Sequence, residues 1–125
     1  RLGNGNTMSS VSRDTPSMLV SFPEADWRAL RALGDAVFER LDARLLHDVQ
    51  AALQAPGSSA SRVASIEALL RERNRIGSGI APLFKRSKAL ILVVTLRRAA
   101  LLTDEEFDSL SEGTREAVLH VLSAS

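Results

Sequence analysis

The chain has 125 residues, of which 45% are hydrophobic and 25% are charged, and its formal net charge is +1. These values are those of an ordinary globular domain and exclude a globally disordered chain. The absence of cysteine excludes disulfide scaffolds, thiolate zinc sites and cysteine nucleophiles. The longest purely apolar run, residues 89–94, is far shorter than the ~20 residues that span a bilayer. We therefore expect a soluble, cytoplasmic protein that does not enter a membrane.

The N-terminal segment, residues 1–16, is rich in Gly, Asn, Ser and Thr and carries few apolar side chains. Such a composition cannot offset the entropy of ordering, so a flexible tail is predicted. Met8 suits a native start, and residues 1–7 are interpreted as a vector-derived extension. Residues 17–125 are expected to form a single helical domain.

A long first helix is predicted over residues 24–54. Ser21 and Glu24 have the spacing of a capping box, and Pro23 suits a first turn. Apolar residues then recur every three or four positions: Trp27, Leu30, Leu33, Val37, Leu41, Leu45, Val49 and Leu53. Such a helix would be about 46 Å long, whereas a compact chain of this size is about 36 Å across. Either the helix bends near Gly34 or a second copy covers its overhang, and we favour the second copy.

A second helix is predicted over residues 60–76, with Ser59 as its cap and Gly77 as its stop. A turn at Gly77, Ser78 and Gly79 would lead to a third helix that opens at Pro82. A glycine turn between two helices is also compatible with a helix-turn-helix motif, although many helical bundles contain such pairs.

Residues 89–96 are apolar on every side and rich in β-branched residues, which fits either a buried helix or a buried strand. We favour the helix, because residues 97–102 continue it without Gly or Pro and only residues 17–22 could supply a partner strand. A helix that is apolar all round must be enclosed, and a second subunit is the simplest enclosure. The residues expected in the core or subunit interface are Leu30, Val37, Leu41, Leu45, Leu90, Ile91, Val94 and Leu96; the candidate interface alone comprises Leu41, Leu45, Val49, Leu90, Ile91 and Val94.

Two short helices are predicted at the C-terminus. Thr103 and Glu106 have the spacing of a capping box, and Ser111 suits the cap of a last helix. The fold class expected from these elements is an all-α bundle of four or five helices, with a long first helix and a buried apolar central helix, assembled as a homodimer.

The charge is unevenly distributed along the chain. Residues 62–98 contain nine basic and two acidic side chains, whereas residues 99–125 contain one basic and six acidic ones. The basic segment is a candidate for binding an anion or nucleic acid, through Arg71, Arg73, Arg75, Gly77, Ser78, Gly79, Lys85, Arg86 and Lys88. We favour the alternative, in which the basic segment pairs with the acidic C-terminal helices, because charge runs are usually solvated or paired.

The motifs that carry enzyme chemistry are absent from the sequence. Glu116 and His120 share a helix face but lack the spacing and the second copy of a di-iron site. A nucleophile elbow, a P-loop and a dinucleotide-binding fingerprint are also absent. No catalytic residue, cofactor or metal is therefore expected. The expected function is that of a non-enzymatic interaction or accessory module acting as a homodimer; the alternatives are a DNA- or RNA-binding regulator and a bundle enclosing an apolar ligand.

Overall fold

The structure is a computed structural model, and it describes residues 22–124. The tail expected over residues 1–16 and the cap expected at Ser21 lie outside the described residues. Within residues 22–124 there are six α-helices, two short 3-10 helices and no strand, which confirms the all-α class. The α-helices are α2 (Glu24–Ala32), α3 (Gly34–Gln54), α4 (Ser59–Ile80), α5 (Ala89–Arg98), α6 (Asp104–Asp108) and α7 (Glu112–Ala124); the 3-10 helices are η1 (Ala81–Leu83) and η2 (Arg86–Lys88).

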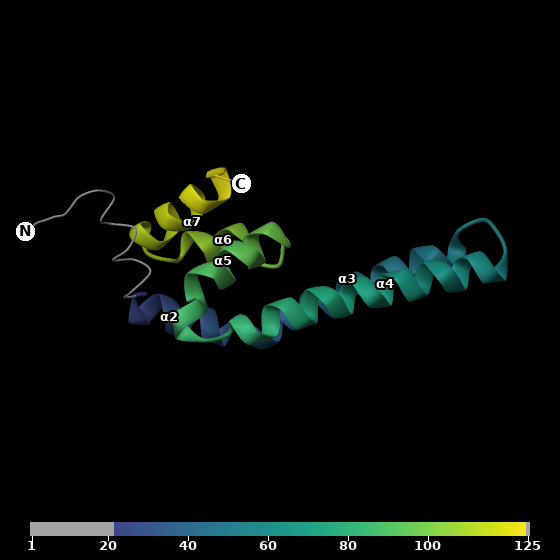
Figure 1. Ribbon diagram of the computed structural model, residues 1–125, viewed down its shortest axis with the longest axis horizontal. Coiled ribbons are helices and arrows are strands. Elements are labelled where there is room, and N and C mark those ends of the chain that lie inside the picture. The colour runs from purple at the N-terminus through teal and green to yellow at the C-terminus, as the bar shows by residue number, and fades with distance from the viewer. Residues whose placement is uncertain (1–21, 125) are drawn as a thin grey trace, which may run out of the picture.

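The helices are arranged as a small head with a projecting arm (Figure 1). Helices α2, α5, α6 and α7 form the helical head, whereas α3 and α4 run antiparallel and form a hairpin that extends away from it. The base of the hairpin belongs to the core of the head, because Val37, Leu41 and Ile80 are buried in one cluster with the residues of α5. With six α-helices among residues 22–124 and a projecting hairpin, the expected bundle of four or five helices is not confirmed. None of the helices in the described part of the chain is both long enough and apolar enough to cross a membrane.

The long first helix predicted over residues 24–54 is interrupted. Helix α2 ends at Ala32 and α3 begins at Gly34, so the single residue Leu33 separates the two helices. Of the two explanations considered for the excess length, the break near Gly34 is present. The backbone at Gly34 passes close to Phe84, whose Cε1 would lie 3.7 Å from a Cβ at this position. Pro23 stands at the N-cap of α2, one position before the first turn in which it was predicted.

The turn predicted at Gly77, Ser78 and Gly79 is wrong, because all three residues lie within α4. The helix begins one residue earlier than expected, with Ser58 accepting a hydrogen bond from the Ser61 N–H at 3.1 Å, and it continues to Ile80. Gly77 is buried where α4 crosses α3, and a Cβ there would stand 2.8 Å from Arg73 Nη1 and 3.6 Å from Phe38 Cε1. Gly77 therefore lies against Phe38 of α3 within a continuing helix and does not end it. The predicted third helix at Pro82 is only the single turn η1.

Residues 89–96 are helical, as favoured over the strand, and they form the centre of the head. Leu92, Val93 and Leu96 have no exposed surface, and Leu90 and Val94 are also buried. The enclosing residues come from this same chain, so the expectation that α5 needs a second subunit to cover it is wrong. Ile91 is the exception, with 55% of its surface exposed.

Helix α5 ends at Arg98 and does not continue through residue 102 as predicted. Its end is a Schellman motif, in which Leu101 N–H donates to the Leu96 carbonyl at 2.9 Å and Ala100 N–H donates to the Arg97 carbonyl at 3.1 Å. Ala100 adopts the left-handed conformation, with φ of 56°, at the position where glycine is usual. The chain therefore turns sharply at a strained alanine.

Ala100→Gly is expected to raise the free energy of unfolding by about 1 kcal/mol. Glycine relieves the Cβ strain of the left-handed conformation, and this gain exceeds the added entropy of the unfolded chain. Urea denaturation followed by circular dichroism measures the change. Ala99→Gly is the matched control, because Ala99 has right-handed helical angles and glycine there should not stabilise. A loss of stability in Ala100→Gly would contradict the assigned turn.

The C-terminal helices begin at polar caps. Thr103 and Glu106 form the predicted capping box at the start of α6. Before α7, the carboxylate of Asp26 accepts hydrogen bonds from Ser111 N–H at 3.0 Å, from Ser111 Oγ at 2.6 Å and from Thr114 Oγ1 at 2.6 Å. Asp26 is only 5% exposed and Thr114 is fully buried, so this network joins α2 to the beginning of α7 inside the head.

Candidate functional site

The hairpin is the first candidate site, because most of its length stands clear of the head (Figure 1). Its two helices are joined by a short turn in which Gly57 has a positive φ of 117°. The seam between the helices is apolar, and an ion pair between Arg73 Nε and Asp42 Oδ1 at 2.7 Å bridges it. Near the tip, Arg62 Nε donates to the Ala55 carbonyl at 2.8 Å. The hairpin is therefore held in a defined register along its whole length.

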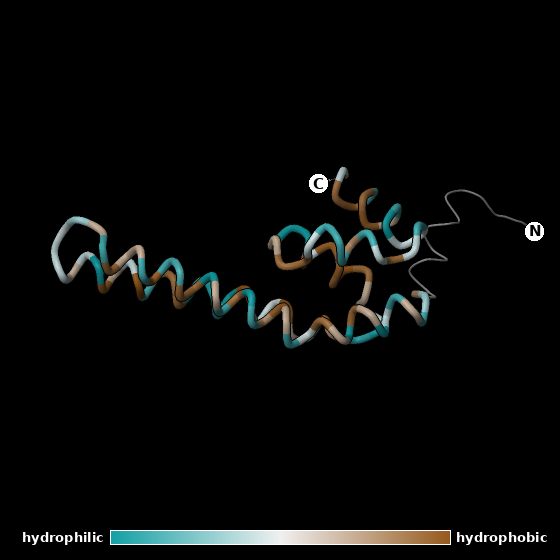
Figure 2. Tube along the Cα trace, turned by 180° about the vertical axis from the view of Figure 1, so that it is seen from behind, coloured by the Kyte–Doolittle hydropathy of each residue, from teal (hydrophilic) through white to brown (hydrophobic). Residues whose placement is uncertain are grey.

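Large apolar side chains of the hairpin remain exposed to solvent. Leu46 and Leu53 on α3 are 66% and 54% exposed, and Val63 and Leu70 on α4 are 55% and 44% exposed. Figure 2 shows apolar positions recurring along both arms of the hairpin toward its tip. Such residues usually gain stability by burial, at roughly 25 cal/mol per Å² of apolar surface. A row of them outside the core therefore indicates an unpartnered surface.

These side chains share one face of the hairpin. On α3, the positions four, seven and eleven residues after Asp42 lie on the same side as Asp42, because they are separated by nearly whole turns. On α4, the positions three, seven and ten residues before Arg73 lie on the side of Arg73 for the same reason. Because Asp42 and Arg73 bond to each other, the two sides form one apolar face, made of Leu46, Val49, Leu53, Val63, Ile66 and Leu70.

The apolar face points away from the head. Arg44, two positions after Asp42, lies on the opposite side of α3. Its guanidinium contacts the end of α5 in the head, with Nη1 donating to the Ala99 carbonyl at 3.0 Å and Nη2 donating to the Ala100 carbonyl at 2.9 Å. The head therefore does not cover the apolar face, which is accessible along the distal part of the hairpin.

Arg40 anchors the base of the hairpin to the head. Its Nη1 donates to the Leu101 carbonyl at 2.9 Å, and its guanidinium forms a bidentate pair with Glu106, at 2.8 Å and 2.6 Å. The hydrogen bonds from Arg40 are the main reason that the pKa of Glu106 is lowered to about 2; the Thr103 N–H contributes further. Arg40 and Arg44 lie one turn apart on α3, so together they bind the carbonyls of the strained turn after α5.

The Arg40–Glu106 pair predicts an acid-dependent loss of stability. Because the folded pKa of Glu106 lies below its ordinary value of 4.5, the pair stabilises the fold above that value and loses its effect as the pH falls toward about 2. We expect a contribution of about 1–2 kcal/mol, reduced by the partial exposure of both side chains. Urea denaturation of wild type and Glu106→Gln should differ at neutral pH and converge near pH 2. A difference that does not change with pH would contradict this prediction.

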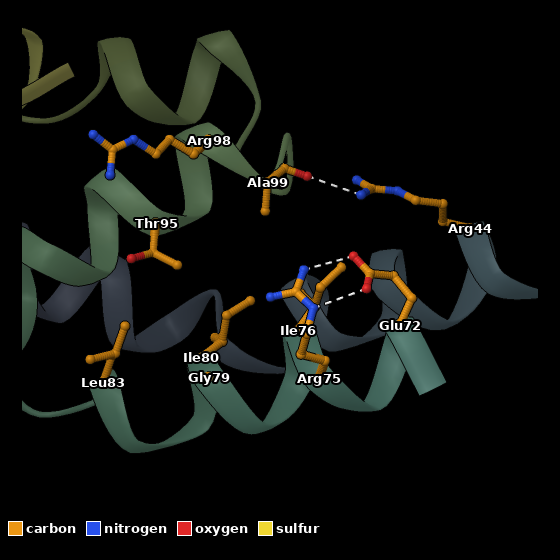
Figure 3. A pocket seen from close by; sticks show the side chains of 10 residues that line it. All are labelled: Arg44, Glu72, Arg75, Ile76, Gly79, Ile80, Leu83, Thr95, Arg98 and Ala99. Carbon is orange, nitrogen blue, oxygen red and sulfur yellow. Dashed lines mark hydrogen bonds and ion pairs between the residues drawn. The ribbon is translucent and has the colours of Figure 1, made fainter. Parts of the chain in front are cut away.

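The second candidate site is a cleft between the hairpin and α5, with a volume of about 540 Å³. Figure 3 shows α4 on one side and the end of α5 on the other, with Arg44 reaching across to Ala99. The cleft is lined by Arg44, Glu72, Arg75, Ile76, Gly79, Ile80, Leu83, Thr95, Arg98 and Ala99. It is open to solvent, so it is not the enclosed apolar cavity expected of a ligand-enclosing bundle.

The residues predicted to bind an anion do not converge on one site. Arg73 pairs with Asp42, and Arg75 pairs with Glu72 on the same helix, with Nη2–Oε2 at 2.7 Å. Arg86 pairs with Glu24 and also donates to the Phe22 carbonyl. Among the described residues, Arg71, Lys85 and Lys88 form no ion pair and are exposed. Because Gly77, Ser78 and Gly79 lie within α4, they do not form a loop whose free backbone N–H groups could bind an anion beside these basic residues.

The favoured alternative, internal pairing of the basic segment, is present, with one pair to the expected C-terminal helices and the others to different partners. Arg97 pairs with Asp104 at 3.0 Å and lies over the ring of Phe107, which links the basic segment to α6. The other pairs of this segment use carboxylates from α2, α3 and α4. Arg40, Arg44 and Arg98 were not singled out from the sequence, although the four-residue spacing of Arg40 and Arg44 on a helix was a visible signal.

The residues predicted at a subunit interface are divided between the core and the hairpin. Leu90 and Val94 are buried in the head and Leu41 at the base of the hairpin, so these three are inaccessible to a partner. Leu45 and Val49 are half-buried along the hairpin, and Ile91 is exposed on the head. The most exposed residues of the apolar face were not in the predicted interface. The sequence did indicate this second face through the Leu45–Leu46 and Leu69–Leu70 doublets. Adjacent leucines on a helix point in different directions, so both cannot lie in the seam between the helices.

Comparison with protein-family models, with curated proteins and with solved structures gave no match to this chain. Within residues 22–124, no cluster of three or more His, Cys, Asp or Glu side chains is placed to hold a metal ion. The function must therefore be inferred from the hairpin and the cleft themselves.

Proposed function

We propose that this protein is a non-enzymatic interaction module that forms a homodimer through the apolar face of its hairpin. The observation that carries the proposal is the row of exposed Leu46, Leu53, Val63 and Leu70 on one side of a two-helix arm. Isolated exposed apolar residues are common on monomers, but a contiguous row of them marks an interaction surface. A two-helix arm also gains most of its stability from packing of an apolar face against other helices.

The dimensions of the face support a second copy as its partner. The whole side of a hairpin with arms of 21 and 22 residues is about 32 Å long and about 20 Å wide, and the six residues of the apolar face span about 11 Å of that length. The area of the whole side, of the order of 600 Å², approaches the roughly 800 Å² that each partner buries in a stable interface, so such an interface extends beyond the six residues. Two hairpins packed face to face form a four-helix bundle, which is the usual way in which helices cover one another.

The charge pattern of the face also supports self-association. Its six residues, from Leu46 to Leu53 and from Val63 to Leu70, are all uncharged aliphatic side chains. The one ion pair beside them, Asp42–Arg73, is neutral as a unit. In a two-fold symmetric interface the same patch meets itself, so a uniformly charged face would repel its copy. The six aliphatic residues add no such repulsion, and Glu67, which lies between Val63 and Leu70 on the same side of α4, is a charged side chain next to them.

Sedimentation equilibrium of the full chain tests the proposal. We expect wild type to sediment at twice the chain mass of 13.5 kDa at micromolar concentration. The variant Leu46→Glu/Leu53→Glu should be monomeric and equally helical, because both positions are exposed in the single chain. Leu119→Glu, on α7 and 53% exposed, is the matched control and should remain dimeric. A monomeric wild type, or a double variant that still dimerises, would overturn the proposal.

A further inference from the structure

We propose that the cleft between α4 and α5 binds a small organic anion, a carboxylate carried on a short apolar chain. This site is separate from the apolar face and does not depend on dimerisation. Its volume of about 540 Å³ lies within the range of roughly 300–1,000 Å³ that holds small ligands in proteins.

The charge of the cleft favours an anion. Arg44 and Arg75 lie on either side of Glu72, which is the one carboxylate of the lining and pairs with Arg75, so this part of the cleft keeps a positive charge on Arg44. Arg98 also lines the cleft, with its guanidinium extending away from those of Arg44 and Arg75 (Figure 3). Arg75 uses Nε and Nη2 for Glu72, and Arg44 uses one N–H of each Nη for the Ala99 and Ala100 carbonyls. A guanidinium has further N–H groups beyond these, and its planar fork matches a carboxylate.

Arg44 also offsets the repulsion that the C-terminal end of α5 would exert on an anion in the cleft. The C-terminal end of a helix presents carbonyl oxygens and the negative end of its dipole, both of which repel an anion. Here the guanidinium of Arg44 binds the Ala99 carbonyl at the end of α5 (Figure 3) and also the Ala100 carbonyl. The end of α5 therefore faces the cleft with a cation in front of its carbonyls.

The apolar part of the ligand follows from the rest of the lining. Ile76, Ile80 and Leu83 line the cleft alongside the arginines. At Gly79 a Cβ would meet no atom within 4 Å, so open space lies above the backbone of α4 at this point. A short aliphatic chain on these residues, with its carboxylate beside Arg44 and Arg75, matches both the apolar and the charged part of the cleft. Octanoate is a simple probe with this chemistry.

Titration of the ¹⁵N-labelled full chain with sodium octanoate, followed by amide chemical shifts, tests the proposal. We expect saturable shifts at Ile76, Gly79 and Thr95 and much weaker binding of octan-1-ol, which has the same chain length without the charge. Arg75→Gln should weaken octanoate binding about tenfold, the effect of one charge-assisted contact. Arg71→Gln is the matched control, because Arg71 is an exposed arginine of α4 outside the cleft, and it should bind as wild type does.

Gly79→Leu tests the location independently. The residue is helical and has free space beside it, so leucine fills the cleft while favouring the helix. This variant should keep its helix content and lose octanoate binding. The absence of saturable shifts, equal binding of octan-1-ol, or unchanged binding by Gly79→Leu would each overturn the proposal. Repeating the titration in the Leu46→Glu/Leu53→Glu background should give the same affinity, which separates this site from the proposed dimer.

Discussion

Replacing Asp26 by alanine is expected to lower the free energy of unfolding by about 3 kcal/mol. The Asp26 carboxylate accepts hydrogen bonds from Ser111 N–H, Ser111 Oγ and Thr114 Oγ1 in a site that is almost closed to solvent. Its removal leaves these donors without their acceptor, and each buried unsatisfied polar group costs about 1–3 kcal/mol. The contact also joins α2 to α7, so its loss should weaken the whole head. Urea denaturation at neutral pH measures the effect.

Asp108→Ala is the matched control for this variant. Asp108 is an exposed carboxylate at the end of α6 and lies outside the buried core of the head. Surface substitutions of this kind usually change stability by less than about 0.5 kcal/mol. If Asp26→Ala is no more destabilising than Asp108→Ala, the buried network does not hold α2 and α7 together as described.

Arg40→Met is expected to lower the free energy of unfolding by about 2 kcal/mol. Methionine keeps the apolar stem but removes the hydrogen bonds to the Leu101 carbonyl and to Glu106. Bonds to charged groups are worth roughly 1.5–3 kcal/mol each when buried, and the partial exposure of both side chains reduces the sum. Urea denaturation measures the loss.

The same variant should also loosen the base of the hairpin. Amide hydrogen exchange near residues 37–44 and 99–102 is expected to become faster in Arg40→Met, because Arg40 connects these segments. Arg28→Met provides the comparison, since Arg28 is an exposed arginine of α2 outside this contact. Unchanged exchange at residues 99–102 would show that Arg40 does not anchor the hairpin to the head.

The helical character of the chain was predictable from the sequence because local signals are strong there. The apolar spacing of α3, the capping box of Thr103 and Glu106, and the continuity between residues 89–96 and 97–98 all pointed to helices. The break at Leu33 was one of two alternatives. Local pattern did not decide between them, because the path of the chain here depends on tertiary packing: Leu30 and Val37, on either side of the break, are both buried in the core of the head.

The main errors of the prediction came from glycine and alanine positions. Gly77 and Gly79 are poor helix formers, so a turn was expected, but the packing of α4 against α3 outweighs that preference. Conversely, Ala100 favours a helix and yet adopts the left-handed conformation, because the buried Leu101 must return to the core. In both places tertiary contacts override the local propensity.

The candidate sites were predictable only in part. The apolar stripe of α3 was visible in the sequence, but the sequence did not separate Leu45, in the seam, from Leu46, on the open face. Which of the two leucines faces the seam depends on where α4 lies beside α3, and the Asp42–Arg73 ion pair marks the side of α3 on which the two helices meet at the open face. The cleft combines Arg44, Arg75 and Arg98 from three helices, so no single stretch of sequence indicated it.

The most direct test of the proposed dimer is a dipolar distance measurement on a singly spin-labelled chain. Because the chain contains no cysteine, Ser65→Cys provides a unique attachment point on α4. Ser65 is exposed and lies two residues after Val63, so a label there is on the side of α4 opposite the apolar face and does not obstruct it. A discrete distance between spins can arise only between two copies. We predict such a distance at micromolar concentration and its disappearance when Leu46→Glu/Leu53→Glu is added. If the spin-labelled Ser65→Cys chain, without further substitution, gives a dipolar signal with no discrete distance, pairing through the hairpin is contradicted.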